Sequence, residues 1–547
     1  MMNVLKHPSF FRPTSRPSSP APLTTPSSVL PSSVLPPNPD SSNGLDRARP
    51  PNKLSLSTFR RPSPAPGTAL NAAPGPLVQD GSYLEILSLK LSEAVSKALA
   101  QPTGPAAANE QVLGKRAIPQ GRGHALGALI ASELKATQDS PHLHRAIIRS
   151  LHRPLSVLLT NLSSHLLPLI SSPAFQSAPT PTVQSPNPNP TQLHAIAIAN
   201  FVGELLETFD ALDLGTDVDL RGDGLKTIRE GLVSLINRVV GPLVNSIRNE
   251  LTPLLDALEV PNLLHGIKWT PGVKASVVHH PSIVILQGIM PVYAKALARY
   301  TTSTTSQSTL ATFLISVIWR GLVALAHRPY TPPSPPSSPP LLPVAIKKRR
   351  GSTSPPLTPP AGRFAIKLPP SRPPSPPPAT TPATAAADAR ALYDLLSLLP
   401  FPSAEKPTTR LAREVVDDAL EGLRALPPLL DAVHSVTASK LDSQDRLDDI
   451  ARELEVLATE VPLLIALPVL LQVPINGGST SVSVWDMIGL TEAEYRKQCL
   501  SGFGRAEECA TTVALRVLEA LRTNQDVHPV VSKWLVMEIV EELEQGH

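Results

Sequence analysis

LKTIREGLVSLINRVVGPLVNSIRNELTPLLDAL, residues 225–258, is the stretch that decides the fold. Its apolar side chains recur at steps of three or four residues, which places them on one face of a helix. They are Leu225, Ile228, Leu232, Leu235, Val239, Leu243, Ile247, Leu251, Leu254 and Leu258. Asp223 is a candidate N-cap, because its carboxylate can accept hydrogen bonds from the free amides of the first turn. Pro242 and Pro253 cannot donate to the helical ladder, so we expect a kink or break near each.

The stretch lies within Thr191–His327, which contains further predicted helices. Apolar side chains at helical spacing cover residues 196–212, and the same spacing recurs over Ile283–Tyr300 and Leu310–Ala326. Single amphipathic helices are only marginally stable in water, so these helices must pack together. The predicted fold class is therefore all-α, as an irregular multi-helix bundle or array.

Helical spacing also extends over much of the remaining sequence. It resumes at Ala389 after a long proline-rich segment, and a short heptad-like seam covers residues 447–464. Residues 474–486 contain Asn-Gly-Gly and then alternating valines, which indicates a small hairpin or an extended connection. No uninterrupted apolar run reaches the roughly 18 residues that span a bilayer. Other predicted helices cover residues 84–99, 124–137, 142–170, 491–499, 506–523 and 529–545.

Proline-rich segments divide the predicted helices into two lobes. The chain has 547 residues and 64 prolines, and Pro/Ser/Thr-rich segments cannot bury enough apolar surface to offset the entropy of ordering. We therefore expect disorder in residues 1–79 and in the linker 328–384, and a surface loop at 171–190. A basic helical domain then covers 80–327 and an acidic helical domain covers 385–547.

Charge is divided unevenly between the two halves of the chain. Residues 388–547 hold 26 Asp/Glu and 14 Lys/Arg, a net of −12, whereas the rest holds 35 basic and 19 acidic residues, a net of +16. No acidic residue occurs between Glu259 and Asp388, or between Asp139 and Glu204. Such a division can steer partners and set association rates, although it does not bear on the fold.

Two kinds of partner fit this division of charge. The first is intramolecular, with the acidic C-terminal lobe docked on the basic N-terminal lobe. The second is an acidic surface outside the chain: nucleic acid, an acidic protein or an anionic membrane. Arg145, Arg149 and Arg153 fall at i, i+4 and i+8 on one predicted helix, beside apolar Ile147 and Leu151, and form a candidate basic surface. A solvated helix face explains the same spacing, and no aromatic side chains are interleaved for base stacking.

Short motifs in the linker and tail suggest regulation. Lys347, Lys348, Arg349 and Arg350 form a candidate nuclear-localisation signal, because such a cluster can bind an acidic import-receptor groove. Each phosphate added nearby contributes about −1.5 to −2 charge and weakens contact with an acidic partner. Ser-Pro pairs are also expected by chance in a chain so rich in proline. The candidate phosphosites, which precede prolines, are Ser19, Ser63, Ser354, Thr358 and Ser375.

Matches to phosphate-binding and calcium-binding loops fail when their positions are compared with the motifs. Gly114-Lys115 lacks the earlier glycine and the following Ser/Thr of a P-loop. In a calcium loop that starts at Asp217, Ile228 stands where the bidentate acid is required. We therefore predict no catalytic or cofactor-binding residue and no cofactor.

Paired histidines and cysteines also lack the companions that a metal site needs. Zinc takes four ligands from Cys, His or a carboxylate at characteristic spacing, and no pair has the remaining ligands nearby in sequence. The pairs are His142/His144, His279/His280 and Cys499/Cys509. No metal-binding residue is therefore predicted.

The sequence favours a non-enzymatic, intracellular helical scaffold or adaptor that binds other proteins and is regulated by Ser/Thr-Pro phosphorylation. Two cysteines cannot form a disulfide framework, which fits a reducing compartment. We expect the nucleus or cytoplasm rather than mitochondria, because prolines in the first 39 residues disfavour the amphipathic helix of a transit peptide. Two alternatives stay open: a peripheral membrane-surface or trafficking component that uses a basic amphipathic helix, and an all-α enzyme without a recognisable motif.

Overall fold

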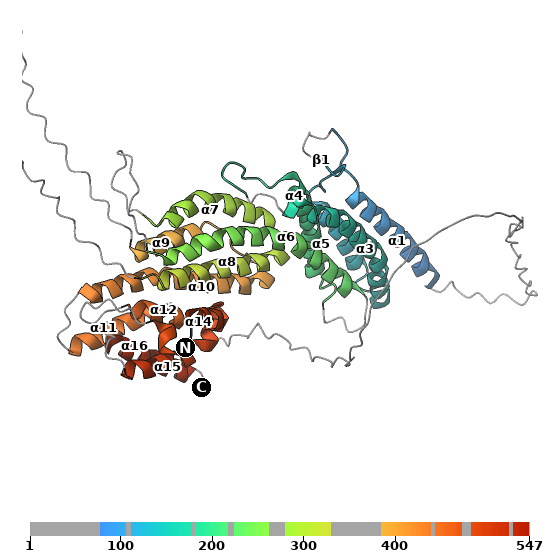
Figure 1. The fold of residues 1–547 in the computed structure, drawn as a ribbon. Coiled ribbons are helices and arrows are strands. Elements are labelled where there is room, and N and C mark those ends of the chain that lie inside the picture. Colours follow the sequence, from blue (N-terminus) through green and yellow to red (C-terminus); the bar gives the residue numbers. More distant parts are fainter. Residues whose placement is uncertain are drawn as a thin grey trace, which may run out of the picture. The chain divides into compact units, whose positions relative to one another are not determined.

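The computed structural model (Figure 1) describes residues 77–105, 111–176, 181–216, 224–261, 279–329, 384–438, 444–472, 483–523 and 529–545. This part of the chain is almost entirely helical, so the predicted all-α fold class is confirmed. The predictions of disorder, for residues 1–79 and for the linker 328–384, concern residues that lie almost wholly outside it.

The N-terminal helices agree closely with the predicted spans, with two corrections. The first helix begins at Leu77, inside the segment 1–79 that was predicted to be disordered, and a short helix, Pro173–Gln176, lies inside the predicted loop 171–190. A two-stranded antiparallel hairpin, which the sequence did not predict, joins the first two helices and turns at Leu113 and Gly114. Both turn residues have positive φ, 53° and 73°, as tight two-residue hairpin turns require. The elements are α1 (Leu77–Leu99), β1 (Gln111–Val112), β2 (Lys115–Arg116), α2 (Arg122–Ala136), α3 (Pro141–Ile170), α4 (Pro173–Gln176) and α5 (Pro190–Ala211).

The decisive stretch forms a long helix that continues through both of its prolines, Pro242 and Pro253. The predicted N-cap is wrong: the capping position is Gly224, whose φ of 75° suits glycine and which makes no side-chain cap. Asp223 itself lies outside the described residues. The elements of this region are α6 (Leu225–Asp256), η1 (Ala257–Glu259), α7 (Pro281–Tyr300) and α8 (Thr304–Ala326).

The C-terminal helices depart from prediction in two places. The seam predicted over 447–464 is interrupted at Pro462, which is the N-cap of a separate short helix. The extended connection predicted over 474–486 is wrong in its described part, because Ser483 caps a helical turn by accepting a hydrogen bond from the Asp486 amide. The elements are α9 (Ala385–Leu396), α10 (Pro407–Ala438), α11 (Gln444–Ala458), α12 (Leu463–Leu470), α13 (Val484–Met487), α14 (Glu492–Gln498), α15 (Phe503–Thr523) and α16 (Pro529–Gln545).

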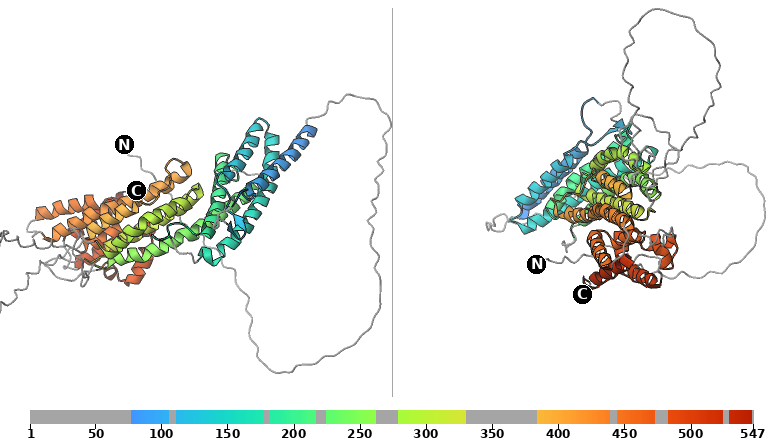
Figure 2. Two further views of the ribbon diagram at one scale, coloured as in Figure 1. Left: turned by 90° about the horizontal axis from the view of Figure 1, so that it is seen from above. Right: turned by 90° about the vertical axis from the view of Figure 1, so that its left-hand side faces the viewer.

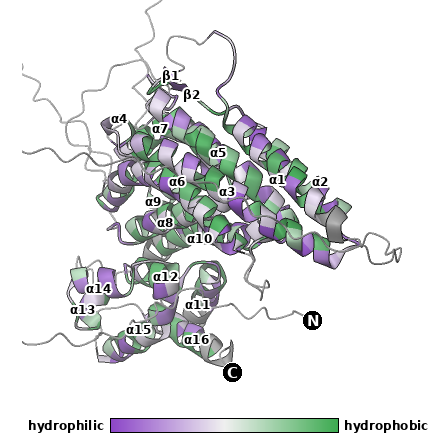
Figure 3. Cartoon of the chain, turned by 90° about the vertical axis from the view of Figure 1, so that its right-hand side faces the viewer, coloured by the Kyte–Doolittle hydropathy of each residue, from purple (hydrophilic) through white to green (hydrophobic). Residues whose placement is uncertain are grey.

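Helix α8 lies at the centre of the apolar core. It packs against α5 and α6, which precede it, and against α9, α10 and α12, which follow it in sequence. Figures 1 and 2 show α8 running beside α6 and α10. One cluster of buried apolar side chains extends from Leu87 in α1 to Ile539 in α16. Along α1, α3 and α5, Figure 3 shows hydrophobic residues interspersed with hydrophilic ones, as expected for helices with one buried face.

Within the described residues, α7 and α8 are long and apolar enough to cross a membrane, judged by length and composition alone. Arg320 interrupts the apolar run of α8, so the sequence of this helix contains no unbroken apolar stretch of that length. Core helices of soluble proteins meet the same criterion. In the most apolar 18 residues of α8, 67% is buried inside the protein, whereas the corresponding share of α7 is 39%. Burial in the core therefore explains why α8 is so apolar. The same explanation covers only part of α7, because much of that helix is not buried.

Helices α2 and α5 approach each other closely at two glycines one helical turn apart. A Cβ atom on Gly123 would lie 2.3 Å from the Phe201 carbonyl oxygen, and one on Gly127 would lie 2.0 Å from Thr208 Oγ1. The same approach caps α2, because the Glu204 carboxylate accepts hydrogen bonds from the amides of Gly121 (2.8 Å) and Gly123 (2.9 Å). A side chain on α5 thus satisfies amides that the first turn of α2 leaves free.

Substitution Gly123→Ala should lower the free energy of unfolding by about 1–3 kcal/mol, because the added methyl group overlaps backbone that cannot move away. Chemical denaturation followed by circular dichroism measures the change. Gly288→Ala in α7 is the matched control: its added Cβ meets no atom within 4 Å, so it should be neutral or stabilising by up to about 1 kcal/mol. Equal effects of the two substitutions would contradict the close packing of α2 on α5.

Candidate functional site

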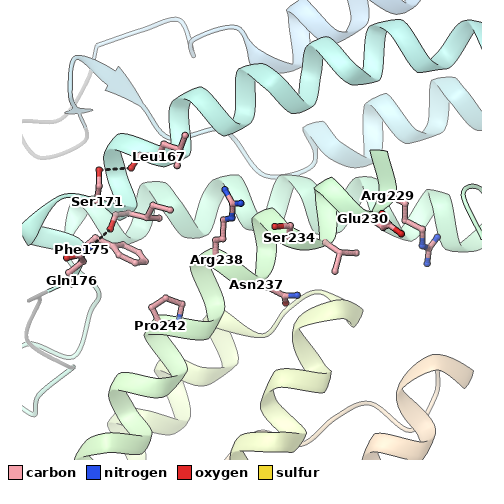
Figure 4. Close-up of a pocket in the computed structure, with 12 residues that line it drawn as sticks. Leu167, Ser171, Phe175, Gln176, Arg229, Glu230, Ser234, Asn237, Arg238 and Pro242 are labelled. Atoms are coloured by element: carbon pink, nitrogen blue, oxygen red, sulfur yellow. Dashed lines mark hydrogen bonds between the residues drawn. The ribbon is translucent and has the colours of Figure 1, made fainter. Parts of the chain in front are cut away.

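A surface groove of about 980 Å³ lies between α6 and the end of α3, with α4 beside it (Figure 4). Its apolar lining comes from Leu167 and Ile170 in α3, Phe175 in α4, and Val233 and Pro242 in α6. Figure 4 shows that the axis of α6 turns near Pro242, at the end of the groove next to α4. The kink predicted at this proline therefore shapes the site.

The residues of α6 that line the groove recur at helical spacing and form a continuous face. This face runs from Glu230 to Pro242, a length of about 18 Å at 1.5 Å per residue. Side chains that line a helix at steps of three and four can receive a second helix laid against them. The groove is long enough for about three turns of such a helix.

Charged groups of opposite sign stand at separate places along this face. Arg229 is occupied, because it pairs with Asp210 and donates a hydrogen bond to the Leu214 carbonyl at 3.2 Å. Glu230 and Arg238 also line the groove, and neither forms an ion pair within the described ranges. A partner helix with a cation near Glu230 and an acid near Arg238 would be bound in one direction only.

A second polar site, buried in the protein, centres on Asp388. Its carboxylate is fully buried and accepts hydrogen bonds from Arg328 Nη1 at 2.6 Å and from the His280 amide at 3.1 Å, and it lies 3.1 Å from His279 Nδ1. Burial is the main cause that lowers the pKa of His280, and the nearby Arg328 lowers it further. The neutral His280 ring accepts a hydrogen bond from the Ser282 amide at 3.2 Å.

We call Asp388, Arg328, His279 and His280 the Asp388 cluster. Its members come from three separate parts of the chain: the start of α7, the residue pair after α8, and the first turn of α9. Arg328 and Asp388 therefore bring together the two ends of residues 330–383. No motif in the sequence indicates this role, since neither His279 nor His280 has a companion at the spacing of a metal or catalytic site. The one available signal was that Asp388 is the first acid after Glu259.

His327 occupies an apolar site between α8 and the C-terminal helices. Its Nδ1 lies 2.9 Å from the Val323 carbonyl, and its ring lies 6.2 Å from that of Trp485 and 6.4 Å from that of Tyr495. Among the described residues, His327 Nε2 and the Tyr495 hydroxyl are buried without a hydrogen-bond partner. Burial lowers the pKa of His327 to about 4, because a second N–H would have no acceptor.

Ion pairs also join the basic and acidic ranges across the linker. Lys406 pairs with Glu207 at 2.8 Å, and Arg496 pairs with Glu259. In both pairs the cation belongs to the acidic range and the acid to the basic range. Among the described residues, the contacts of Asp388 with Arg328 and with His279 have the polarity that the overall charge division would favour.

The candidate basic surface lies on α3, where Arg145, Arg149 and Arg153 are exposed. The apolar face of the same helix is not free, because Ile147 and Leu151 are almost completely buried in the core. A membrane would need that face, so α3 offers only its cations. The localisation candidates Lys347–Arg350 and all five candidate phosphosites lie outside the described residues.

Within the part of the chain that the structure describes, no three His, Cys, Asp or Glu side chains gather in a way that could hold a metal ion. Cys499 and Cys509 are both free thiols. The Cys509 thiol donates to the Gln498 carbonyl at 3.7 Å, and burial raises the pKa of Cys499 to about 11. Such a thiol is a poor nucleophile at neutral pH.

Substitution Asp388→Ala should lower the free energy of unfolding by about 3–5 kcal/mol, because it leaves Arg328 buried without its counter-ion. Urea denaturation measures the loss. Asp431→Ala is the control, since Asp431 forms an exposed pair with Arg390 and should cost about 1 kcal/mol at most. A loss at Asp388 no larger than that at Asp431 would show that the Asp388 cluster is not buried as described.

Stability should fall as the pH falls from about 6.5 to about 4, by up to about 3 kcal/mol from His327 alone. In that range the unfolded chain binds a proton at His327 that the folded protein does not. His327→Phe should therefore make the decline shallower, as measured by thermal unfolding at a series of pH values. His142→Phe, at an exposed position on α3, is the matched control. If the two variants decline alike, His327 is not the group responsible.

Comparisons of the chain with protein-family models, with curated proteins and with solved structures gave no match.

Proposed function

We propose that this chain is a non-enzymatic helical scaffold or adaptor that binds a helical segment of a partner protein in the groove between α3 and α6. The observation that carries the proposal is the open groove, whose apolar lining comes from α3 and α4 and from Val233 and Pro242 in α6. Grooves of this kind bind amphipathic helices through apolar anchors at helical spacing. The free charges of Glu230 and Arg238 would set the direction of the bound helix.

Regulation and location belong to the same proposal and are supported by sequence alone. Ser354, Thr358 and Ser375 stand near the basic cluster Lys347–Arg350. Phosphates there would oppose its positive charge and weaken its contact with an import receptor or another acidic partner. We therefore propose an intracellular protein, in the nucleus or cytoplasm, whose import responds to proline-directed phosphorylation.

Docking of the acidic range on the basic range also stays a proposal. The polarity of the pairs Lys406–Glu207 and Arg496–Glu259 does not support net charge as its cause. Buried apolar contacts of α8 with α10 and α12 support a docking that depends little on salt.

Substitution Asn237→Trp, at an exposed position in the groove, should fill part of the groove and reduce recovery of the partner by about tenfold or more. Native co-purification of the full-length protein with quantitative mass spectrometry measures this. Asn249→Trp is the matched control, since Asn249 is an exposed asparagine of the same helix outside the groove.

Three outcomes of this experiment are informative. A stoichiometric partner that is kept by Asn249→Trp and lost by Asn237→Trp supports the adaptor proposal and identifies its pathway. A partner kept by both variants contradicts the groove as its binding site. A solitary protein that carries a small molecule would favour the all-α enzyme instead.

A further inference from the structure

The two cysteines of the chain lie together at the turn between α14 and α15. Cys499 is the C-cap of α14, and its amide donates a hydrogen bond to the Tyr495 carbonyl at 2.8 Å. Cys509 lies about two turns into α15. Its thiol is 3.7 Å from the carbonyl oxygen of Gln498, the residue that precedes Cys499. The two thiols are neighbours: after burial, the charge and the hydrogen bond of Cys509 are the next causes that raise the pKa of Cys499.

The two thiols differ in how easily a dissolved reagent reaches them. Cys499 is only 6% exposed, whereas Cys509 is half-buried. A small oxidant therefore reaches Cys509 first, and Cys499 is close enough to react in a second step.

Arg505 places a positive charge beside this pair. It lies one turn before Cys509, and its Nε donates at 2.6 Å to the same Gln498 carbonyl that accepts from the Cys509 thiol. An ion pair with Glu508 at 2.9 Å also holds the Arg505 side chain. Burial has the larger effect on the pKa of Cys499, and the charge of Arg505 opposes it. A cation next to a cysteine favours the thiolate, which is the reactive form.

We propose that Cys499 and Cys509 form a reversible intrachain disulfide, with a low-molecular-weight disulfide such as oxidised glutathione as the oxidant. The Cys509 thiolate attacks one sulfur of oxidised glutathione, which releases one glutathione and leaves a mixed disulfide on Cys509. The Cys499 thiol then gives its proton to solvent, and its sulfur attacks the Cys509 sulfur and displaces the second glutathione. Each released glutathione takes up a proton. Two protein thiols are thus oxidised while one glutathione disulfide is reduced to two thiols.

The second step is intramolecular, so the Cys499 sulfur acts at a high effective concentration although it is buried. Disulfides inside cells are usually transient and redox-sensing, which agrees with the intracellular location proposed above. The disulfide does not depend on the groove between α3 and α6, which lies on other residues.

The disulfide would close the turn through which α15 contacts α8. Between the two cysteines, the Leu500 carbonyl accepts a hydrogen bond from Trp319 Nε1 at 2.8 Å, and the Phe503 ring lies 4.5 Å from the Trp319 ring. A covalent link from Cys499 to Cys509 reduces the freedom of the unfolded chain. Oxidation should therefore stabilise this turn and its contact with α8.

Incubation of the reduced full-length protein with mixtures of reduced and oxidised glutathione tests the proposal. A maleimide reagent counts the free thiols after denaturation, and mass spectrometry gives the intact mass. The wild-type protein should lose both thiols together, with a mass lower by two hydrogen atoms, and dithiothreitol should restore both. Trypsin cleaves after Lys497, Arg505 and Arg516, so the digest should contain residues 498–505 and 506–516 as one linked pair of peptides.

Substitution of each cysteine in turn provides the matched controls. Cys499→Ser should stop the reaction at the first step and keep one glutathione on Cys509. Cys509→Ser should leave Cys499 unmodified, because burial protects its thiol. The proposal is overturned if wild-type chains keep glutathione on Cys509, form disulfide-linked dimers on a non-reducing gel, or retain both free thiols at every glutathione ratio.

Thermal unfolding of the oxidised and reduced wild-type protein gives a second readout. The oxidised form should unfold at a temperature higher by about 2 °C or more, and Cys509→Ser should show no such difference. A disulfide that lowers the unfolding temperature would also overturn the proposal, because it would show that the two thiols do not meet in the folded protein.

Discussion

Helix α8 is apolar on almost every side. It is therefore stable only when other parts of the protein cover each of these sides. Helices from before and after the linker provide that cover, since α5 and α6 lie on it together with α9, α10 and α12. Helices of both ranges therefore pack on α8, although a long proline-rich segment separates them in sequence. Polar contacts at its margin, such as Trp319 Nε1 donating to the Leu500 carbonyl at 2.8 Å, fix how the helices meet.

The charge asymmetry of the sequence has a smaller structural effect than its size suggests. Exposed ion pairs contribute little to stability, and those that join the two ranges do not follow the net charges. Charge contributes more to stability in the buried pair of Arg328 with Asp388. Either ion, buried there without its partner, would lower the free energy of unfolding.

Much of the fold could be predicted because helical spacing is a local signal. Ten apolar positions, nine in α6 and Leu258 in the following turn η1, identified that helix, and all but one of them, Leu254, are buried. The capping of α2 and the polar contacts between distant helices could not be predicted, because they depend on residues far apart in sequence. Glu204 caps α2 across 83 residues, and Asp388 binds His280 across 108.

The candidate sites show the same limit. Arg145, Arg149 and Arg153 were correctly assigned to one helix, but the sequence did not show that the apolar face beside them is used by the core. The groove became visible only when α3, α4 and α6 were in place, because no single segment contains it.

The pair of Arg328 with Asp388 has a consequence for how this chain can change over evolutionary time. It holds the two ends of residues 330–383 together, so the distance that this segment has to bridge does not depend on its length. Residues could be inserted there or deleted without altering the positions of α8 and α9. Motifs such as the basic cluster and the Ser-Pro pairs could therefore be gained, lost or duplicated while the core stays as it is.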